Sequence, residues 1–130
     1  MEYVYVISPV TADPDFGAKR AALKAVARSL GVTVLFPLDR QADVALKKTS
    51  GDIRGAKLVL ADLTYERPSC YFELGLAEAS GADVGIIAKK GTPIHQVGYA
   101  TEVHFYGDLD EYKRIVDRLL SSRISGTQVA

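Results

Sequence analysis

Asp62 and Glu73 are the residues whose types and spacing could carry chemistry. Asp62 lies near the end of the apolar run 58–64, and Glu73 lies about one turn inside a helix that is predicted to begin near Pro68. A carboxylate can stabilise a positive charge that develops on a substrate or trap it covalently, while a second carboxyl group can protonate a leaving group or orient a water molecule. The pair therefore indicates chemistry at an atom that becomes positively charged.

The residues around this pair predict a strand followed by a helix. The run 58–64 is apolar, bounded by turn residues and too short for a helix, which is typical of a buried strand. Pro68 and Ser69 indicate the helix start, with Ser69 as the N-cap residue that satisfies an otherwise unpaired N–H group. Ligands of open α/β sheets bind outside the carboxyl ends of the strands, so we expect Asp62 and Glu73 to face one crevice.

Other segments continue this alternation of strand and helix. Apolar residues recur at helical spacing over 16–30, and Lys19 is among the charged residues expected elsewhere on that helix. Asp108 is the expected N-cap of the last helix, and the chain is expected to fray from Ser121 onward. The remaining expected elements are strands over 4–7, 32–36, 84–88 and 102–106 and a helix over 42–55.

Strands separated by helices imply parallel pairing through right-handed crossovers. The sequence therefore predicts a single-domain α/β fold of the flavodoxin-like (Rossmann-like) kind, a three-layer sandwich around a five-stranded parallel sheet of order 2-1-3-4-5. We expect this domain to span residues 1–122, with a flexible C-terminal tail over 123–130. Its switch point would lie between the first and third strands, where the segment 8–16 forms the wall opposite Glu73.

The remaining candidates are polar or aromatic residues, most of them on the segments 8–16 and 62–73 that border this crevice, where they could contact a ligand. The segment 8–16 could equally be an ordinary surface loop that binds no ligand, and Arg67 could be a solvated surface charge. Glu73 could equally be a first-turn acid favoured by the helix dipole, and Asp62 could cap the turn that follows it. The expected substrate-binding residues are Ser8, Asp13, Phe16, Asp52, Thr64, Arg67 and Ser69, with Arg40 and Lys47 as further possible phosphate contacts.

Charge and composition argue against several classes of partner. The 130 residues carry 16 Lys and Arg against 16 Asp and Glu, whereas a nucleic-acid-binding surface needs a concentrated excess of positive charge. The single cysteine, Cys70, cannot form an internal disulfide, and the sequence shows no basic leader and no long apolar span. We therefore expect a soluble, cytoplasmic protein that binds neither nucleic acid nor membrane.

Cofactor motifs are missing from the sequence. Neither G-x-G-x-x-G nor G-x-x-x-x-G-K-[ST] occurs, which argues against a dinucleotide oxidoreductase and against a phosphate-loop NTPase. His95 and His104 are far apart and have no acidic or cysteine companion at metal-ligand spacing. Cys70 near a helix start makes a weak case for a nucleophile, and a small packing residue is the simpler interpretation. We expect neither a cofactor nor a metal.

Two short motifs flank the loop that ends in Pro68. They are Ala61-Asp62-Leu63-Thr64 and Tyr71-Phe72-Glu73-Leu74-Gly75-Leu76-Ala77. Together they resemble the nucleoside 2-deoxyribosyltransferase-like family, which includes deoxyribosyltransferases and N-glycosidases that hydrolyse nucleoside monophosphates. The resemblance implies that Glu73 attacks the anomeric carbon or stabilises the sugar cation when the bond to the base breaks, with Asp62 as its catalytic partner. It also implies a nucleoside or nucleotide substrate, no cofactor, and a homodimer or higher homo-oligomer.

The chain departs from that family at two positions. Several nucleotide hydrolases of the group carry a further aspartate where this chain has Thr49, and Asp52 follows one turn later. Family members also place Asn at the helix start, where this chain has Ser69. Either Asp52 substitutes for the missing aspartate from a shifted frame, or the hydrolytic machinery is incomplete.

Three functions remain open at this point. The first is an N-glycosidase or deoxyribosyltransferase with Glu73 as the nucleophile. The second is a non-catalytic nucleotide-binding or signalling module, which the missing aspartate favours. The third is an NAD-cleaving enzyme, because Toll/interleukin-receptor-like domains share this topology and use a helix glutamate in a comparable place. The identity of the base, the sugar and the acceptor stays open.

Overall fold

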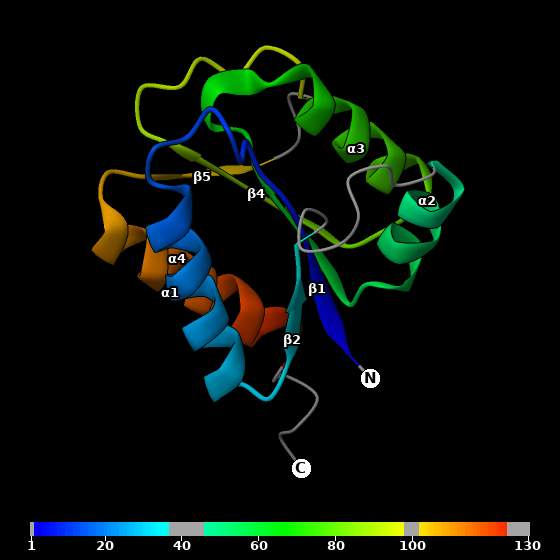
Figure 1. The fold of residues 1–130 in the computed structure, drawn as a ribbon, viewed down its shortest axis with the longest axis horizontal. Coiled ribbons are helices and arrows are strands. Elements are labelled where there is room, and N and C mark those ends of the chain that lie inside the picture. The colour runs from blue at the N-terminus through cyan, green and yellow to red at the C-terminus, as the bar shows by residue number, and fades with distance from the viewer. Residues whose placement is uncertain (1, 37–45, 98–101, 125–130) are drawn as a thin grey trace.

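The computed structural model describes residues 2–36, 46–97 and 102–124. Within these ranges the chain forms one sheet with helices on both of its faces (Figure 1). The strands are β1 Tyr3–Ile7, β2 Thr33–Leu35, β3 Leu58–Asp62, β4 Val84–Lys89 and β5 Val103–Tyr106. The helices are α1 Phe16–Ser29, α2 Leu46–Gly55, α3 Pro68–Ala79 and α4 Leu109–Arg123, with a short 3₁₀ turn, η2, at Thr64–Glu66.

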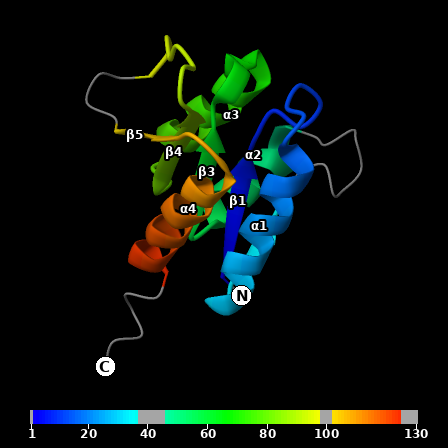
Figure 2. The same cartoon turned by 90° about the vertical axis from the view of Figure 1, so that its left-hand side faces the viewer.

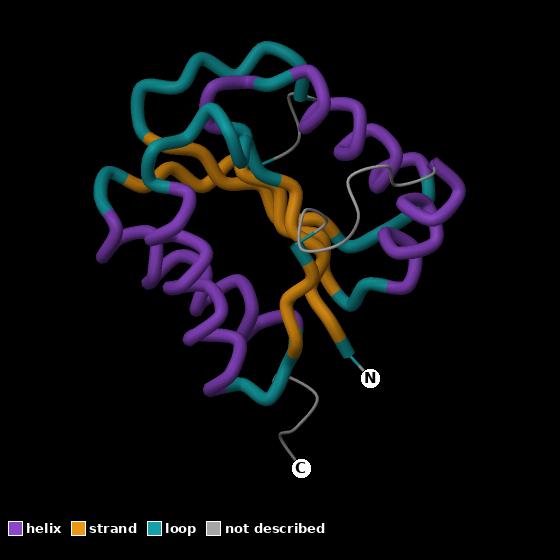
Figure 3. The backbone as a smooth tube through the Cα atoms, in the orientation of Figure 1, coloured by secondary structure: helices purple, strands orange, loops and turns teal. Residues whose placement is uncertain are grey.

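The described strands pair in parallel in the order β2-β1-β3-β4-β5. Figure 1 shows α1 and α4 together on one face and α2 and α3 together on the other, and the turned view in Figure 2 shows α1 and α4 side by side. The backbone tube in Figure 3 shows the sheet as the middle layer between these helix pairs. The predicted three-layer flavodoxin-like sandwich of order 2-1-3-4-5 is therefore confirmed.

The sheet has an apolar core on each side. Every residue of β3 is buried, as expected for a parallel strand that is covered by helices on both faces. Leu58 and Leu60 pack with α1 and α4, whereas Val59 and Ala61 pack with the α2 and α3 side. Successive residues of a strand point to opposite faces, so this alternation also fixes the face on which Asp62 lies.

The carboxyl edge of the sheet positions the site. Strands β1 and β3 are neighbours, with Ile7 opposite Ala61, so the segments that leave them emerge side by side. The segment after β1, residues 8–15, leads into α1, and the segment after β3 passes through η2 into α3. This is the switch point of the sheet, where such folds bind ligands.

The start of α3 differs from the prediction. The helix begins at Pro68, its N-cap residue is Arg67, and no side chain caps it, so Ser69 lies in the first turn and is not the N-cap. Proline suits this first helical position because its missing N–H would have no partner there and its φ angle is already helical. The hydroxyl of Ser69 is therefore not engaged in the predicted capping bond.

The end of α4 also differs from the prediction. The expected cap is confirmed, because the Asp108 carboxylate accepts a hydrogen bond of 2.8 Å from the backbone N–H of Glu111. The helix does not fray at Ser121, however, but continues to Arg123, and Ile124 is only 2% exposed. Ile124 follows the last helical residue and packs in the α1 and α4 core. Residues 125–130, and 42–45 of the expected second helix, lie outside the described residues.

The described residues contain neither a membrane-spanning helix nor a metal-binding cluster. None of the helices in these ranges has both the length and the apolar character that crossing a bilayer requires. No group of three or more His, Cys, Asp and Glu side chains in the same ranges is arranged to hold a metal ion.

Candidate active site

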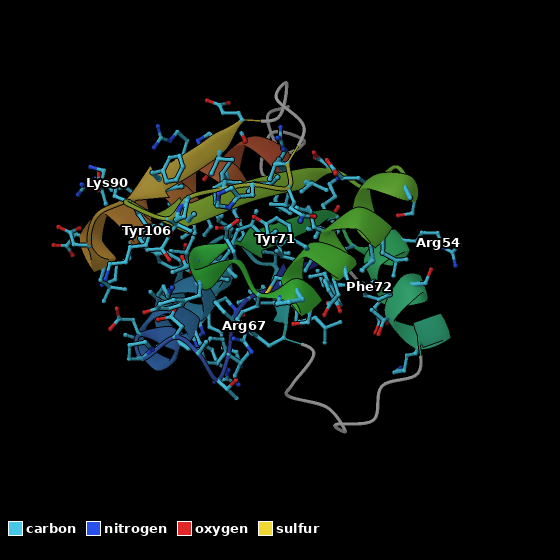
Figure 4. The ribbon with its side chains drawn as sticks, turned by 90° about the horizontal axis from the view of Figure 1, so that it is seen from above. Arg54, Arg67, Tyr71, Phe72, Lys90 and Tyr106 are labelled. Carbon is cyan, nitrogen blue, oxygen red and sulfur yellow. The ribbon has the colours of Figure 1, made fainter. Side chains whose placement is uncertain are left out.

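A cavity of about 290 Å³ lies between the segment after β1 and the start of α3. Figure 4 shows Arg67 at the start of α3, next to the blue segment that follows β1. The cavity opens at the carboxyl edge of the sheet, as predicted for a ligand site of this fold. Its lining residues are Val6, Ile7, Ser8, Pro9, Val10, Thr11, Ala12, Phe36, Arg67, Ser69 and Glu73.

Glu73 enters this cavity from the second turn of α3. Its Oε1 atom accepts a hydrogen bond of 2.9 Å from the hydroxyl of Tyr5. Tyr5 is fully buried in β1, on the face that α3 covers, so its hydroxyl group is a fixed donor. One carboxylate oxygen of Glu73 is thus held by the sheet, in a cavity large enough for a sugar ring.

The environment of Glu73 changes its proton affinity. Burial raises the pKa of its carboxyl group above the ordinary value, and the hydrogen bond from Tyr5 acts in the opposite direction. A carboxylate that is partly removed from water interacts more strongly with a nearby positive charge than an exposed one does. The arrangement can therefore stabilise a cationic centre that develops in the cavity.

Asp62 lies in a different place from the one expected. Its carboxylate is 4% exposed and accepts hydrogen bonds from the Thr64 hydroxyl at 2.6 Å, the Tyr106 hydroxyl at 2.8 Å and the Lys19 ammonium at 3.0 Å. It lines a smaller cavity of about 10 Å³ beside the first one. The prediction that Asp62 and Glu73 share one crevice is therefore wrong.

Strand alternation explains this difference. Asp62 points to the same face of β3 as Leu58 and Leu60, which pack against α1 and α4. Glu73 lies on α3, which covers the opposite face of the sheet. Each carboxylate therefore lines a different cavity, although the two cavities share Val6, Ser8 and Phe36 at the carboxyl edge of the sheet.

The other predicted residues fall into two groups. Ser8, Arg67 and Ser69 line the larger cavity together with Glu73, and Ser8 also lines the smaller one. Asp13 and Phe16 line only the smaller cavity.

The residues around the smaller cavity make contacts within the protein. Asp13 is 6% exposed and forms an ion pair with Lys19, and the ring of Phe16 meets the ring of Phe36 edge-on at 5.8 Å. Thr64 is 4% exposed and belongs to the hydrogen-bond network of Asp62. Their predicted contact with a substrate is therefore not supported by their positions.

Asp52 does not fill the place of the missing aspartate. It lies in the last turn of α2, where its backbone carbonyl accepts a hydrogen bond of 2.6 Å from the hydroxyl of Tyr3, at the start of β1. That end of the helix lies at the amino edge of the sheet, away from the cavity. Arg40 and the side chain of Lys47 lie outside the described part of the chain.

Sequence reasoning missed Tyr5 and Lys19. In the sequence, Tyr5 has the pattern of an aromatic residue in a buried strand. Only the folded structure shows that its hydroxyl donates a hydrogen bond to Glu73 on α3. Lys19 is 6% exposed and belongs to the buried stripe of α1, together with Ala22 and Leu23. Its spacing of three and four residues from these two was the signal that could have found it.

Cys70 has the properties of a packing residue. Its side chain is 2% exposed, and burial together with the negative charge of Glu73 raises the pKa of its thiol to about 11. The reactive thiolate form is therefore scarce at neutral pH.

Comparisons with known proteins give a likeness in structure but not in sequence. No protein-family model matches the chain, and no curated protein matches it significantly. A solved 2-deoxyribosyltransferase from Leishmania mexicana aligns with 90% of this chain and 98% of its own, at 22% identity and a TM-score of 0.63.

Two further solved structures agree. A 2-deoxyribosyltransferase from the psychrotolerant bacterium Bacillus psychrosaccharolyticus covers 85% of this chain and 90% of its own, at 19% identity and a TM-score of 0.65. A CMP N-glycosidase from Clostridium botulinum covers 92% of this chain and 100% of its own, at 18% identity and a TM-score of 0.67. The chain therefore has the fold of the 2-deoxyribosyltransferases and of this N-glycosidase, and the resemblance drawn from the sequence is confirmed at the level of the fold.

Proposed function

We propose that the protein is an enzyme that cleaves or transfers the N-glycosidic bond of a nucleoside or a nucleoside 5′-monophosphate, with Glu73 as the nucleophile. The observation that carries this proposal is the Glu73 carboxylate, held by Tyr5 at 2.9 Å in a cavity at the switch point of the sheet. The named activities of the proteins that share this fold, deoxyribosyl transfer and CMP N-glycoside cleavage, support it.

The proposed reaction has two steps. First, a carboxylate oxygen of Glu73 forms a bond to the anomeric carbon while the bond from that carbon to the base nitrogen breaks. The electron pair of the broken bond leaves with the base, which takes up a proton. In the second step a water oxygen or the nitrogen of another base attacks the same carbon, loses a proton and releases the Glu73 carboxylate. Tyr5 engages one oxygen of Glu73, which leaves the other for the attack.

Asp62 has a positioning role in this proposal. Its carboxylate accepts hydrogen bonds from Lys19, Thr64 and Tyr106, and it does not line the cavity of Glu73. It therefore acts through its neighbours and does not contact the sugar.

A 5′-monophosphate is the favoured form of the substrate. Arg67 and Ser69 line the cavity at the amino end of α3, where the partial positive charge of the helix attracts anions. A guanidinium group binds phosphate oxygens in a planar, two-bonded geometry, which adds specificity. The proposal includes Ser8 as a further polar contact from the opposite wall.

The proposal also includes a homo-oligomer in the cytoplasm. The rings of Tyr65 and Phe72 are 51% and 57% exposed, and large exposed apolar side chains are common where protein copies meet. Sedimentation of the purified protein tests this assembly directly.

A nucleotide-binding module is the second candidate. Thr49 occupies the position of the aspartate that the resembled hydrolases carry, and Asp52 lies at the far end of α2. These two positions favour binding without cleavage. The NAD-cleaving alternative has no separate observation in its favour.

Release of free base from a panel of substrates tests the proposal. The protein is incubated with ribonucleosides, deoxyribonucleosides, their 5′-monophosphates and NAD, each with and without a second free base. Chromatography should show release of base from a monophosphate, faster than from the matching nucleoside. Binding of monophosphates without any release would support the module instead, and release of nicotinamide alone would support NAD cleavage.

A further inference from the structure

Lys19 is a buried charge at the centre of a polar cluster that the proposed reaction does not use. Its ammonium group forms ion pairs with Asp13 and Asp62 and donates a hydrogen bond of 2.6 Å to the hydroxyl of Tyr106. The side chains of Lys19, Asp13 and Asp62 are only 7%, 3% and 6% exposed. An ammonium group has three N–H donors, and three oxygen atoms, one each from Asp13, Asp62 and Tyr106, surround it.

The cluster joins four parts of the fold. Lys19 belongs to α1, Asp62 ends β3 and Tyr106 ends β5, whereas Asp13 belongs to the segment 8–15 after β1. Three of these parts are regular elements that the core holds in place. The contact between Lys19 and Asp13 is the buried tie to the segment, which has no helix or strand of its own. A second ion pair, between Asp15 and Lys89 at 3.9 Å, links the segment to β4 but is exposed to solvent.

That segment forms one wall of the cavity into which Glu73 projects. Its residues Ser8 to Ala12 all line the cavity. Within it, the backbone N–H of Asp15 donates to Asp13 Oδ1 at 2.9 Å, and the N–H of Asp13 donates to the carbonyl of Pro9 at 3.1 Å. Asp13 therefore folds the segment locally through one oxygen and anchors it to Lys19 through the other.

The charge of Lys19 persists across the physiological range of pH. Burial acts to lower the pKa of the ammonium group, but the negative charge of Asp62 and the hydrogen bonds to Asp13 and Tyr106 outweigh it and raise the pKa. The ammonium side of the contact therefore keeps its charge at neutral pH.

We propose that the ion pair between Asp13 and Lys19 is a clamp that holds the segment 8–15 in its binding shape before a substrate arrives. Lys19 is then a positioning residue for the substrate wall, and Asp13 serves the site through Lys19 without touching the substrate. A wall that is ordered in advance spares the binding step the entropy cost of ordering it. The binding part of this inference rests on the proposed function, whereas the ordering of the segment does not.

Asp13→Asn is the sharpest test of the clamp. Asparagine keeps the Oδ1 atom that folds the segment, but it replaces the charged oxygen that faces Lys19. The variant should still fold, because Lys19 keeps Asp62 as a partner and the cluster then holds one positive and one negative charge. Asp15→Asn is the matched control, since it removes the same charge from an exposed position of the same segment. The pair that it loses, between Asp15 and Lys89 at 3.9 Å, lies in solvent and contributes little.

Hydrogen–deuterium exchange of the free protein measures how well the segment 8–15 is ordered in the absence of substrate. Amides of the segment 8–15 should exchange roughly tenfold faster in Asp13→Asn than in the wild type, with exchange in β1 and β3 unchanged. The control should exchange like the wild type. Exchange of these amides at the wild-type rate in Asp13→Asn would overturn the clamp. Global unfolding of Asp13→Asn would overturn it as well, because the contact with Lys19 would then stabilise the whole fold and not the segment alone.

Kinetics with a cleaved monophosphate separate positioning from chemistry. Asp13→Asn should raise KM roughly tenfold and leave kcat within about threefold, because only a fraction of the molecules then has the wall in place. A lower kcat at unchanged KM would overturn the positioning role. If the wild type cleaves no substrate, the proposed function fails, and the exchange experiment still decides the clamp.

Discussion

At the scale of single residues, the contact between Tyr5 and Glu73 explains how a helix carboxylate becomes a fixed reagent. The hydroxyl of Tyr5 donates to Glu73 Oε1 from a strand that is buried beneath α3. A hydrogen bond to a carboxylate favours its charged form, so this contact limits the rise in pKa that burial causes. Tyr5 therefore both orients the nucleophile and opposes the effect of burial on its pKa.

Tyr5→Phe tests this double role. Without the hydroxyl, the pKa of Glu73 should rise further, so the acidic limb of the pH profile of kcat/KM should move to higher pH. Phenylalanine fills nearly the same volume, and the fold should persist. Tyr3→Phe is the control, because that hydroxyl bonds to the carbonyl of Asp52, outside the cavity. An unchanged acidic limb in Tyr5→Phe would contradict the role of Tyr5.

The sequence predicted part of the site at this scale. Glu73, Ser8, Arg67 and Ser69 were expected on chemical grounds and line one cavity. Asp62 was expected beside them, although its position two residues after Leu60 already indicated the opposite face of the sheet. Its partners could not be predicted, because Lys19 and Tyr106 reach it only through tertiary packing.

At the scale of elements, the ends of helices were harder to predict than their existence. The predictions of α4 from its periodicity and of its N-cap at Asp108 are confirmed. Both depend on neighbouring residues alone, because a carboxylate just before an apolar stripe can accept a hydrogen bond from the first turn. Ser69 was expected to be the N-cap of α3 because serine is a good N-cap residue. The helix begins earlier in the chain, because Pro68 takes the first helical position and Arg67 is the N-cap. Local preferences compete at such boundaries, and one residue decides the outcome.

The cap of α4 gives a prediction for this scale. Asp108→Ala removes the acceptor of the hydrogen bond from Glu111 N–H and should lower the free energy of unfolding by about 1 kcal/mol. Asp110→Ala, in the first turn of the same helix, should cost only a few tenths of a kcal/mol. Urea unfolding measures both. Equal losses in the two variants would show that the cap contributes no more than a charge near the helix dipole.

At the scale of the whole molecule, the alternation of strands and helices was sufficient to predict the fold. Parallel strands must be joined by crossover connections, and these are almost always right-handed. With five strands, these constraints favoured the order that the structure has, in which β1 lies between β2 and β3. The end of α4 was placed too early because Ser121 and Ser122 look like a polar tail, whereas the helix continues to Arg123. Ile124 continues the apolar stripe one turn beyond Leu120, and that long-range packing decides the boundary.

Ile124 therefore belongs to the core, and its truncation should be costly. Ile124→Ala should lower the free energy of unfolding by about 2 kcal/mol or more, because it leaves a cavity beside α1 and α4. Lys113→Ala, exposed on the same helix, should change it by less than about 0.5 kcal/mol. Thermal or urea unfolding measures both variants. If Ile124→Ala lost as little stability as Lys113→Ala, the prediction that Ile124 belongs to the core would be wrong.

The Glu73 carboxylate also affects how the stability of the protein depends on pH. Because burial raises its pKa in the folded protein, the stabilising contribution of its proton is present at low pH and is lost as the pH rises through the folded pKa. Glu73→Gln carries no charge to desolvate and keeps an oxygen for the hydrogen bond from Tyr5. At pH 7 this variant should therefore melt no lower than the wild type.

The rate of base release by Glu73→Gln is the decisive measurement for the role of Glu73 as the nucleophile. Glu78→Gln is the matched control, because it removes the same charge from an exposed position of the same helix. With the monophosphate that the wild type cleaves best, Glu73→Gln should bind the substrate but release base at least about a hundredfold more slowly, since the group that attacks the anomeric carbon is gone. Glu78→Gln should release base at the wild-type rate. Release by Glu73→Gln at the wild-type rate would contradict the assignment of the nucleophile and the mechanism that depends on it.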